Sequence, residues 1–93
     1  MKSLKKWNGM RIEYTKNAKD DIEHWKKSNK DIYKKIKLLI EDIQENPYKG
    51  LGLPKALKSD LNGVWSRRIS QEHRLLYYKE KDKIIICQCR YHY

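Results

Sequence analysis

The chain has 93 residues, which is enough for one domain with a modest core. Its 22 basic and 12 acidic residues give a formal charge of +10, which favours a polyanionic partner: nucleic acid, an anionic membrane surface or an acidic protein. Three Trp, seven Tyr and regular apolar spacing exclude a disordered chain, and no apolar stretch resembles a signal peptide or a membrane span. We therefore expect a single domain that works in the cytoplasm.

The first part of the chain predicts one strand and then a helix. Residues 1–9 form a basic lead-in that we expect to be poorly ordered, so the domain proper covers residues 10–93. Apolar and polar residues alternate in Met10–Tyr14, which is typical of a short strand. Either Thr15 or Asn17 suits the cap of the following helix, which a Ser-Asn pair ends.

The strongest helical pattern follows, over about residues 30–45, where apolar residues recur along one face. The short break before it predicts an antiparallel helical hairpin. Asn46 and Pro47 end the second helix, because the residue before a proline is pushed out of the helical region. The centre of the chain, residues 47–63, is rich in loops and contains one short candidate edge strand at 54–58.

The last third of the chain predicts three strands, over residues 64–70, 73–79 and 83–91, joined as hairpins. Cys87 and Cys89 lie two apart on the last strand, so we expect both thiols on one face, reduced and packed in a core. Helices that precede a meander predict an α+β fold: an antiparallel sheet of four to five strands with the two-helix hairpin packed on one face.

Strand alternation gathers cations on one face of this sheet. A tight hairpin would place Arg68 and Arg74 on the same side, near Lys58. Lys49 and Arg67 are further RNA-binding candidates. A solvated basic face is the simpler explanation of any one of these residues. Together with the nearby tyrosines they favour single-stranded RNA, because aromatic rings stack on unpaired bases while cations hold phosphates.

The sequence ends on Arg90-Tyr91-His92-Tyr93, which brings an imidazole to the end of the last strand. An imidazole titrates near neutrality, so His92 is able to protonate a leaving oxygen. RNA carries its own nucleophile, the 2′-hydroxyl, so cleavage needs a base, a cation for the phosphorane and an acid, but no metal or cofactor. His92 as acid and Arg74 as phosphate clamp meet two of these needs. A frayed terminal residue is the simpler explanation of His92 from spacing alone.

Five motifs occur in order along residues 10–93. They are KKIKLLIEDI, NPYKGLGLPKALK, LNGVWSRRI, EHRLLYY and the terminal CRYHY. In this combination the chain resembles the YoeB family of toxins, within the RelE superfamily of ribosome-dependent mRNA interferases. The resemblance implies a microbial-ribonuclease-like fold, cleavage of mRNA in the ribosomal A site, and neutralisation by a YefM-like antitoxin whose acidic segment covers the basic face. A homodimer is a further expectation.

The resemblance also implies roles for individual residues. The family's clamp arginine falls on Arg74, its general acid on His92 and its final tyrosine on Tyr93. A second arginine and a lysine that contact phosphate fall on Arg68 and Lys58. These five positions would form the catalytic and RNA-binding surface.

The family's general base, a glutamate, falls on Lys55 here, which leaves the base open. A lysine that is protonated at neutral pH is a poor base, although neighbouring Lys58 and Arg68 would favour its neutral form. Alternatively Glu72 takes the role, or Lys55 only stabilises phosphate charge in a weakened or inactive homologue that still binds RNA or the ribosome. A third interpretation is a structural protein whose basic face binds an acidic polypeptide.

Overall fold

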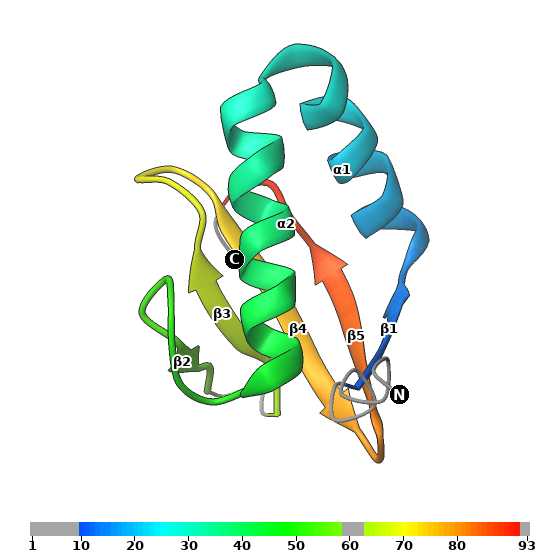
Figure 1. Ribbon diagram of the computed structural model, residues 1–93, viewed down its shortest axis with the longest axis vertical. Helices are drawn as coiled ribbons and strands as arrows, with labels where there is room; N and C mark the ends of the chain where they lie inside the picture. Colours follow the sequence, from blue (N-terminus) through cyan, green and yellow to red (C-terminus); the bar gives the residue numbers. More distant parts are fainter. Residues whose placement is uncertain (1–9, 59–62, 92–93) are drawn as a thin grey trace, which may run out of the picture.

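The computed structural model describes residues 10–58 and 63–91 (Figure 1). The lead-in expected at residues 1–9 lies outside this part of the chain, as do positions 59–62 of the expected turn and positions 92–93. The elements in chain order are β1 (Arg11–Tyr14), α1 (Lys16–Ser28), α2 (Lys30–Glu45), β2 (Lys55–Ala56), β3 (Trp65–Arg68), β4 (Arg74–Glu80) and β5 (Lys83–Gln88).

Side-chain caps set the ends of the two helices. The Thr15 hydroxyl accepts a hydrogen bond from the Ala18 N–H at 3.1 Å, so Thr15 rather than Asn17 caps α1. Asn29 ends α1, since its N–H bonds the Trp25 carbonyl, and its side chain then caps α2 by accepting two backbone N–H groups. With one residue between them, the helices fold back on each other as the predicted hairpin (Figure 1).

The five strands form one sheet in the order β1-β5-β4-β3-β2. β2 to β5 pair antiparallel, as predicted, but β1 pairs parallel with β5, so the sheet is mixed. The expectation of a wholly antiparallel sheet is wrong for this pair. A parallel pair needs a long crossover, which the two helices supply here. The alternation of residues within β1 does not determine the direction in which its partner strand runs.

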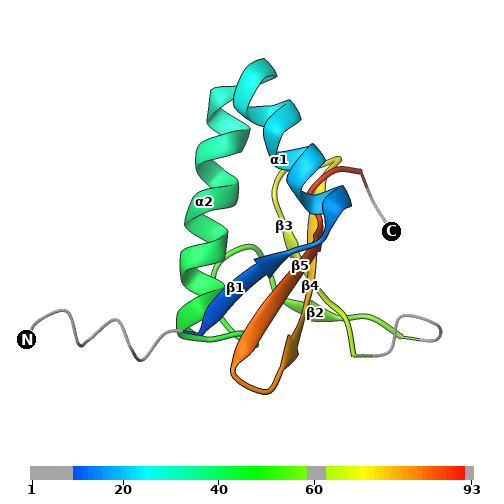
Figure 2. The ribbon, with the colours of Figure 1, turned by 90° about the vertical axis from the view of Figure 1, so that its right-hand side faces the viewer.

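Both helices cover one face of the sheet, as predicted, while β2 lies toward the other side (Figure 2). The core between the layers joins Trp25 of α1 and the apolar stripe of α2 to the inward-facing residues of β4 and β5. Its fully buried apolar members are Ala18, Ile36, Leu39, Ile43, Leu75, Ile84, Ile86 and Cys89.

The pairing of β4 with β5 shifts by one residue at Cys87. This extra residue reverses the alternation along β5, so Cys89 turns into the core while Cys87 stays half-buried outside it. The expectation that both thiols share one face is therefore wrong. Both cysteines are free thiols, and burial raises the pKa of the Cys87 thiol.

β5 ends at Gln88 rather than at the predicted residue 91, because side chains of α1 capture the next peptide groups. The Asp21 carboxylate accepts the Cys89 N–H at 2.9 Å, and the Trp25 indole N–H donates to the Cys89 carbonyl at 2.9 Å. The ladder therefore stops, and the chain turns toward α1. No helix in residues 10–58 and 63–91 is both long and apolar enough to cross a bilayer.

We predict that Asn29→Ala lowers the free energy of unfolding by about 1 kcal/mol, the usual cost of losing an N-cap. Asn29→Asp should stay close to the wild type, because a carboxylate accepts the same two N–H groups of α2. Urea denaturation of the three proteins measures the difference, and an alanine variant as stable as the aspartate variant would contradict the capping role.

Candidate functional site

Arg68 and Arg74 lie directly opposite each other, as cross-strand partners in the antiparallel β3–β4 pair. Their neighbours Arg67 and Leu75 are fully buried, and Leu75 belongs to the core under the helices. The two arginines therefore leave the sheet on the face away from the helices, as the alternation predicted. We call these two residues the arginine pair. Like charges placed opposite each other repel, so the pair is suited to share an anion such as a phosphate.

The Arg74 guanidinium is held against the turn between β3 and β4. Its Nη1 donates to the carbonyls of Ser70 at 2.8 Å, His73 at 3.1 Å and Gln71 at 3.2 Å. Among residues 10–58 and 63–91, its recorded hydrogen bonds use Nη1 alone, which leaves Nε and Nη2 for a ligand. The Arg74 side chain is half-buried and held in place by these hydrogen bonds, whereas the Arg68 side chain is exposed.

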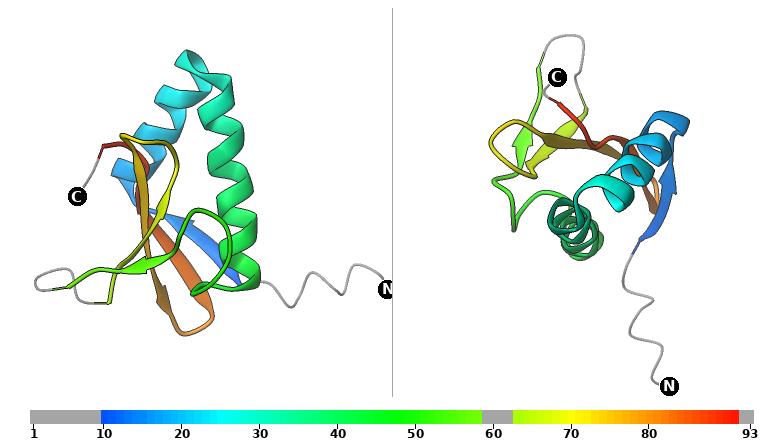
Figure 3. Two further views of the ribbon diagram at one scale, coloured as in Figure 1. Left: turned by 90° about the vertical axis from the view of Figure 1, so that its left-hand side faces the viewer. Right: turned by 90° about the horizontal axis from the view of Figure 1, so that it is seen from above.

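Lys55 reaches the same face from the short edge strand β2. It pairs with Ser66, which has the alternation of Arg68, so its side chain emerges beside the arginine pair. Lys55 is exposed, and so is Lys58 just beyond the strand. Figure 3 shows β2 on the side of the sheet away from the helices.

Two other predicted residues, Lys49 and Glu72, lie outside the strands that carry Lys55 and the arginine pair. Lys49 is exposed in the loop after α2. Glu72 is exposed in the β3–β4 turn, where its Oε1 lies 3.8 Å from Nε2 of His73.

Arg67, predicted to bind RNA, is instead completely buried on the helix side of the sheet. All five of its N–H donors have acceptors. These are the Tyr77 hydroxyl at 3.0 Å, the Asp42 carboxylate at 2.7 Å, and the carbonyls of Leu51 at 2.8 Å, Asn46 at 2.8 Å and Lys49 at 3.2 Å. The expectation of RNA binding is wrong for Arg67, because no part of its guanidinium remains for a ligand.

We call Arg67 with Asp42 and Tyr77 the Arg67 hub. The hub joins β3 and β4 to the end of α2 and to the loop that leads toward β2; the Tyr77 hydroxyl also donates to the Pro47 carbonyl at 2.6 Å. Sequence reasoning missed it, although one signal was present. Arg67 alternates with Trp65 and Ile69 on the apolar side of β3, where a charge requires a buried partner.

The hub also sets the ionisation of its acid. The hydrogen bond from Arg67 lowers the pKa of the Asp42 carboxyl, and the N–H of Leu51 acts in the same direction. Burial raises the pKa of the Tyr77 hydroxyl against the opposing effect of Arg67. At neutral pH the hub therefore holds one carboxylate, one guanidinium and one neutral phenol.

The end of the chain is bonded directly to Arg74. The Arg74 N–H donates to the Tyr91 carbonyl at 3.0 Å, and the Tyr91 N–H donates to Nδ1 of His73 at 2.7 Å. Two consecutive residues of β4 and its turn thus hold both peptide groups of Tyr91. His92, which follows in the sequence, and Tyr93 lie outside the described residues, so their predicted roles stay predictions.

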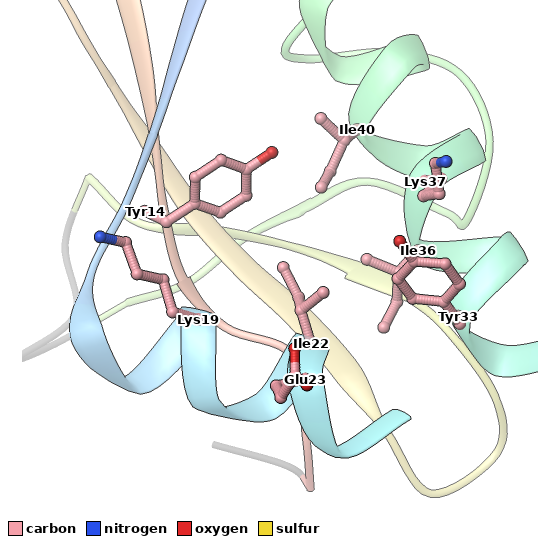
Figure 4. A pocket seen from close by; sticks show the side chains of 8 residues that line it. All are labelled: Tyr14, Lys19, Ile22, Glu23, Tyr33, Ile36, Lys37 and Ile40. Atoms are coloured by element: carbon pink, nitrogen blue, oxygen red, sulfur yellow. The ribbon is translucent and has the colours of Figure 1, made fainter. Parts of the chain in front are cut away.

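A separate groove of about 350 Å³ lies between α1, α2 and the end of β1 (Figure 4). Its apolar lining includes Ile22, Tyr33 and Ile40, and Tyr14 closes one side. None of the predicted site residues lines it. The candidate site is therefore the open face around the arginine pair, not this groove.

Comparison with known proteins gives the family. The model of the YoeB-like toxins of bacterial type II toxin–antitoxin systems matches residues 14–93. The chain belongs to this family. A toxin YoeB from Streptomyces coelicolor is 48% identical over 84 residues, which cover 90% of this chain and 100% of that protein. The family named from the motifs is thus confirmed.

Solved structures of YoeB proteins have the same fold. A YoeB/ParE toxin from Agrobacterium tumefaciens is 38% identical, with a TM-score of 0.86 over 90% of this chain and 100% of that one. YoeB from Staphylococcus aureus is known as a dimer, at 39% identity and a TM-score of 0.84, and in a YoeB–YefM complex, at 40% and 0.83; each match covers 90% of this chain and 98% of that one. The α+β, RelE-like fold is confirmed.

We predict that the contribution of Asp42 to stability depends on pH. Because its pKa is lowered in the folded protein, this contribution is complete above the ordinary aspartate pKa of about 3.9 and is lost as pH falls through the folded pKa. Asp42→Asn should be less stable than the wild type at pH 7, and the difference should shrink on acidification toward pH 2. Urea denaturation across this range measures it.

The matched control is Asp20→Asn, which removes an exposed carboxylate paired with Lys16 at 2.9 Å. Exposed pairs contribute about 0–1 kcal/mol, so this variant should differ little from the wild type at any pH. A gap between wild type and Asp42→Asn that persists unchanged at pH 2 would contradict the role of the charged carboxylate.

Proposed function

We propose that this YoeB-family toxin is an endoribonuclease that cleaves mRNA in the ribosomal A site. The observation that carries the proposal is the arginine pair: two cations face each other on the sheet face away from the helices, and the backbone that leads to His92 is bonded to one of them. Phosphate is the anion that such a pair accepts, and guanidinium groups match its geometry. The family membership and the charge of +10 agree with an RNA substrate.

The reaction needs no nucleophile from the protein. The RNA 2′-oxygen attacks the adjacent phosphorus and loses its proton to a base, and the bond from phosphorus to the 5′-oxygen breaks. In our assignment Arg74 stabilises the charge of the phosphorane, His92 gives its proton to the 5′-oxygen, and Tyr93 orients or stacks the base. The products are a 2′,3′-cyclic phosphate, which opens to a 3′-phosphate, and a 5′-hydroxyl. Arg68 and Lys58 hold neighbouring phosphates.

Lys55 is the candidate base by position, because it emerges on the face of the arginine pair from the edge strand β2. It is solvent-exposed, and it stands where the resemblance leads us to expect a glutamate. This observation favours a second candidate function, a homologue that binds RNA or the ribosome and cleaves weakly or not at all. Glu72, the alternative base, is exposed in the β3–β4 turn, where its Oε1 lies 3.8 Å from Nε2 of His73.

We further propose that a YefM-like antitoxin binds and neutralises the protein; S. aureus YoeB forms a complex with YefM. An acidic antitoxin segment is complementary to the basic face and would cover the arginine pair. The S. aureus YoeB dimer supports a homodimer for this chain as well. A ribosome-dependent nuclease would act in the cytoplasm.

We predict that Arg74→Ala abolishes cleavage of mRNA in a purified translation system, mapped by primer extension with and without ribosomes. The expected wild-type result is cuts only when ribosomes are present. Removing one donor to a transition-state oxyanion typically costs about 100- to 1,000-fold in rate, so loss should be near complete. The control is Arg11→Ala, which removes an exposed arginine from the opposite edge of the sheet. A wild type that binds ribosomes without cutting would contradict the nuclease, and one that binds no ribosome would support a purely structural partner.

We predict that Lys55→Glu raises the cleavage rate, because a carboxylate is ionised and basic at neutral pH whereas an exposed ammonium is not. Lys34→Glu makes the same change of charge on the exposed part of α2 and should not raise it. The single-turnover cleavage rate at saturating toxin measures both. If Lys55→Glu is slower than the control, Lys55 itself contributes to catalysis; if activity appears only with Lys55→Glu, the natural protein is the inactive homologue.

A further inference from the structure

We propose that His73, together with Asp21 and Trp25 of α1, positions the end of the chain for RNA cleavage. We call these three residues the C-terminal clamp. They hold the backbone of Cys89 and Tyr91, the last part of the chain before His92. The inference rests on the proposed function, since it explains how a terminal segment would keep an acid in register with Arg74.

His73 is buried in the β3–β4 turn, at 9% exposure, and bonds a backbone group rather than solvent. Its Nδ1 accepts the Tyr91 N–H at 2.7 Å. Accepting this bond requires a lone pair on Nδ1, so the neutral ring carries its proton on Nε2. The ring lies edge-on to Trp25, with centroids 4.8 Å apart, and against the Tyr91 ring, with centroids 5.6 Å apart.

Asp21 and Trp25 of α1 bind the backbone of Cys89, two residues before Tyr91. Asp21, 8% exposed, accepts the Cys89 N–H, and the Trp25 indole donates to the Cys89 carbonyl. The N–H and the carbonyl of Cys89 are the donor and the acceptor that β5 would have used for strand pairing if it had continued. Side chains of α1 thus replace the hydrogen bonds of strand pairing, and the chain leaves the sheet after β5.

Tyr91 then turns the chain sharply, with φ at +62°, a left-handed conformation that is unfavourable for a residue other than glycine. Such a conformation persists where the surroundings over-determine it. Here His73 holds the N–H of Tyr91 and the backbone N–H of Arg74 holds its carbonyl. The backbone of Tyr91, which precedes His92 in the sequence, is therefore fixed relative to Arg74, the proposed phosphate clamp.

This arrangement couples the two predicted catalytic groups through one short path. Arg74 bonds the β3–β4 turn through its guanidinium and bonds Tyr91 through its backbone. His73, its neighbour, accepts the N–H of Tyr91 and so fixes the preceding peptide group. Loss of the His73 acceptor should therefore displace the acid relative to the phosphate while the arginine pair stays in place. A displacement of about 1 Å from a residue outside the chemistry can slow a reaction about 100-fold.

The experiment compares three variants of the full chain in ribosome-dependent cleavage. His73→Leu keeps apolar volume and removes the acceptor, and His73→Asn returns an acceptor, because its Oδ1 takes the place of Nδ1. His24→Leu is the matched control: His24 also meets the Trp25 ring edge-on, with centroids 4.6 Å apart, but its recorded hydrogen-bond partner is Ser28 of α1. Single-turnover rate at saturating toxin, the toxin concentration for half-saturation and thermal stability are measured for each.

We expect His73→Leu to lower the saturating rate about 10- to 100-fold with an unchanged half-saturating concentration, and His73→Asn to recover most of that rate at a stability no higher than that of His73→Leu. His24→Leu should match the wild type. The proposal is overturned if His73→Leu cleaves at the wild-type rate, or if the leucine and asparagine variants lose rate equally and in proportion to stability. A wild type that does not cleave at all would instead overturn the proposed function.

Discussion

The buried guanidinium of Arg67 is the interaction on which the candidate site depends. Its five donors meet one carboxylate, one phenol and three carbonyls, so a charge that burial alone would make very unfavourable is fully paired. These partners come from α2, from β4 and from the loop after α2. The loop leads through Gly52, whose carbonyl accepts the Arg68 N–H, toward Lys55. The hub thus sets where the edge strand begins relative to β3.

The sheet separates two tasks by the alternation of its strands. On the helix side, Arg67 and Leu75 complete the packing; on the other side, the arginine pair is presented to solvent with no helix above it. Moving β3 by one residue would exchange its two arginines and bury the wrong one. The hub therefore favours the observed register of β3 against β4. All five donors of Arg67 are satisfied only when its side chain points inward, and only then does Arg68 lie opposite Arg74.

The three parts of the proposed site are supported unequally. Arg74 is held by its turn, and the N–H groups of Cys89 and Tyr91 donate to Asp21 of α1 and to His73. Lys55 lies on a strand of two residues at the edge of the sheet and is exposed. A site built this way would combine a constrained arginine with a less constrained position for the proposed base. The less constrained position is also the one at which this chain carries a lysine where the resemblance leads us to expect a glutamate.

The sequence by itself determined both helices, the approximate strands and the face shared by Arg68 and Arg74, because each of these follows from local alternation, helical spacing and caps. It also determined the family, through motifs such as WSRRI and EHRLLYY. Only the tertiary structure decided that β1 runs parallel to β5, that Cys87 is an extra residue that turns Cys89 inward, and that Arg67 is buried. Each of these depends on partners far away in the chain. The clamp on Tyr91 is of the same kind: its hydrogen bonds join α1 and the β3–β4 turn to the last residues, and no pattern within any one segment predicts that they meet.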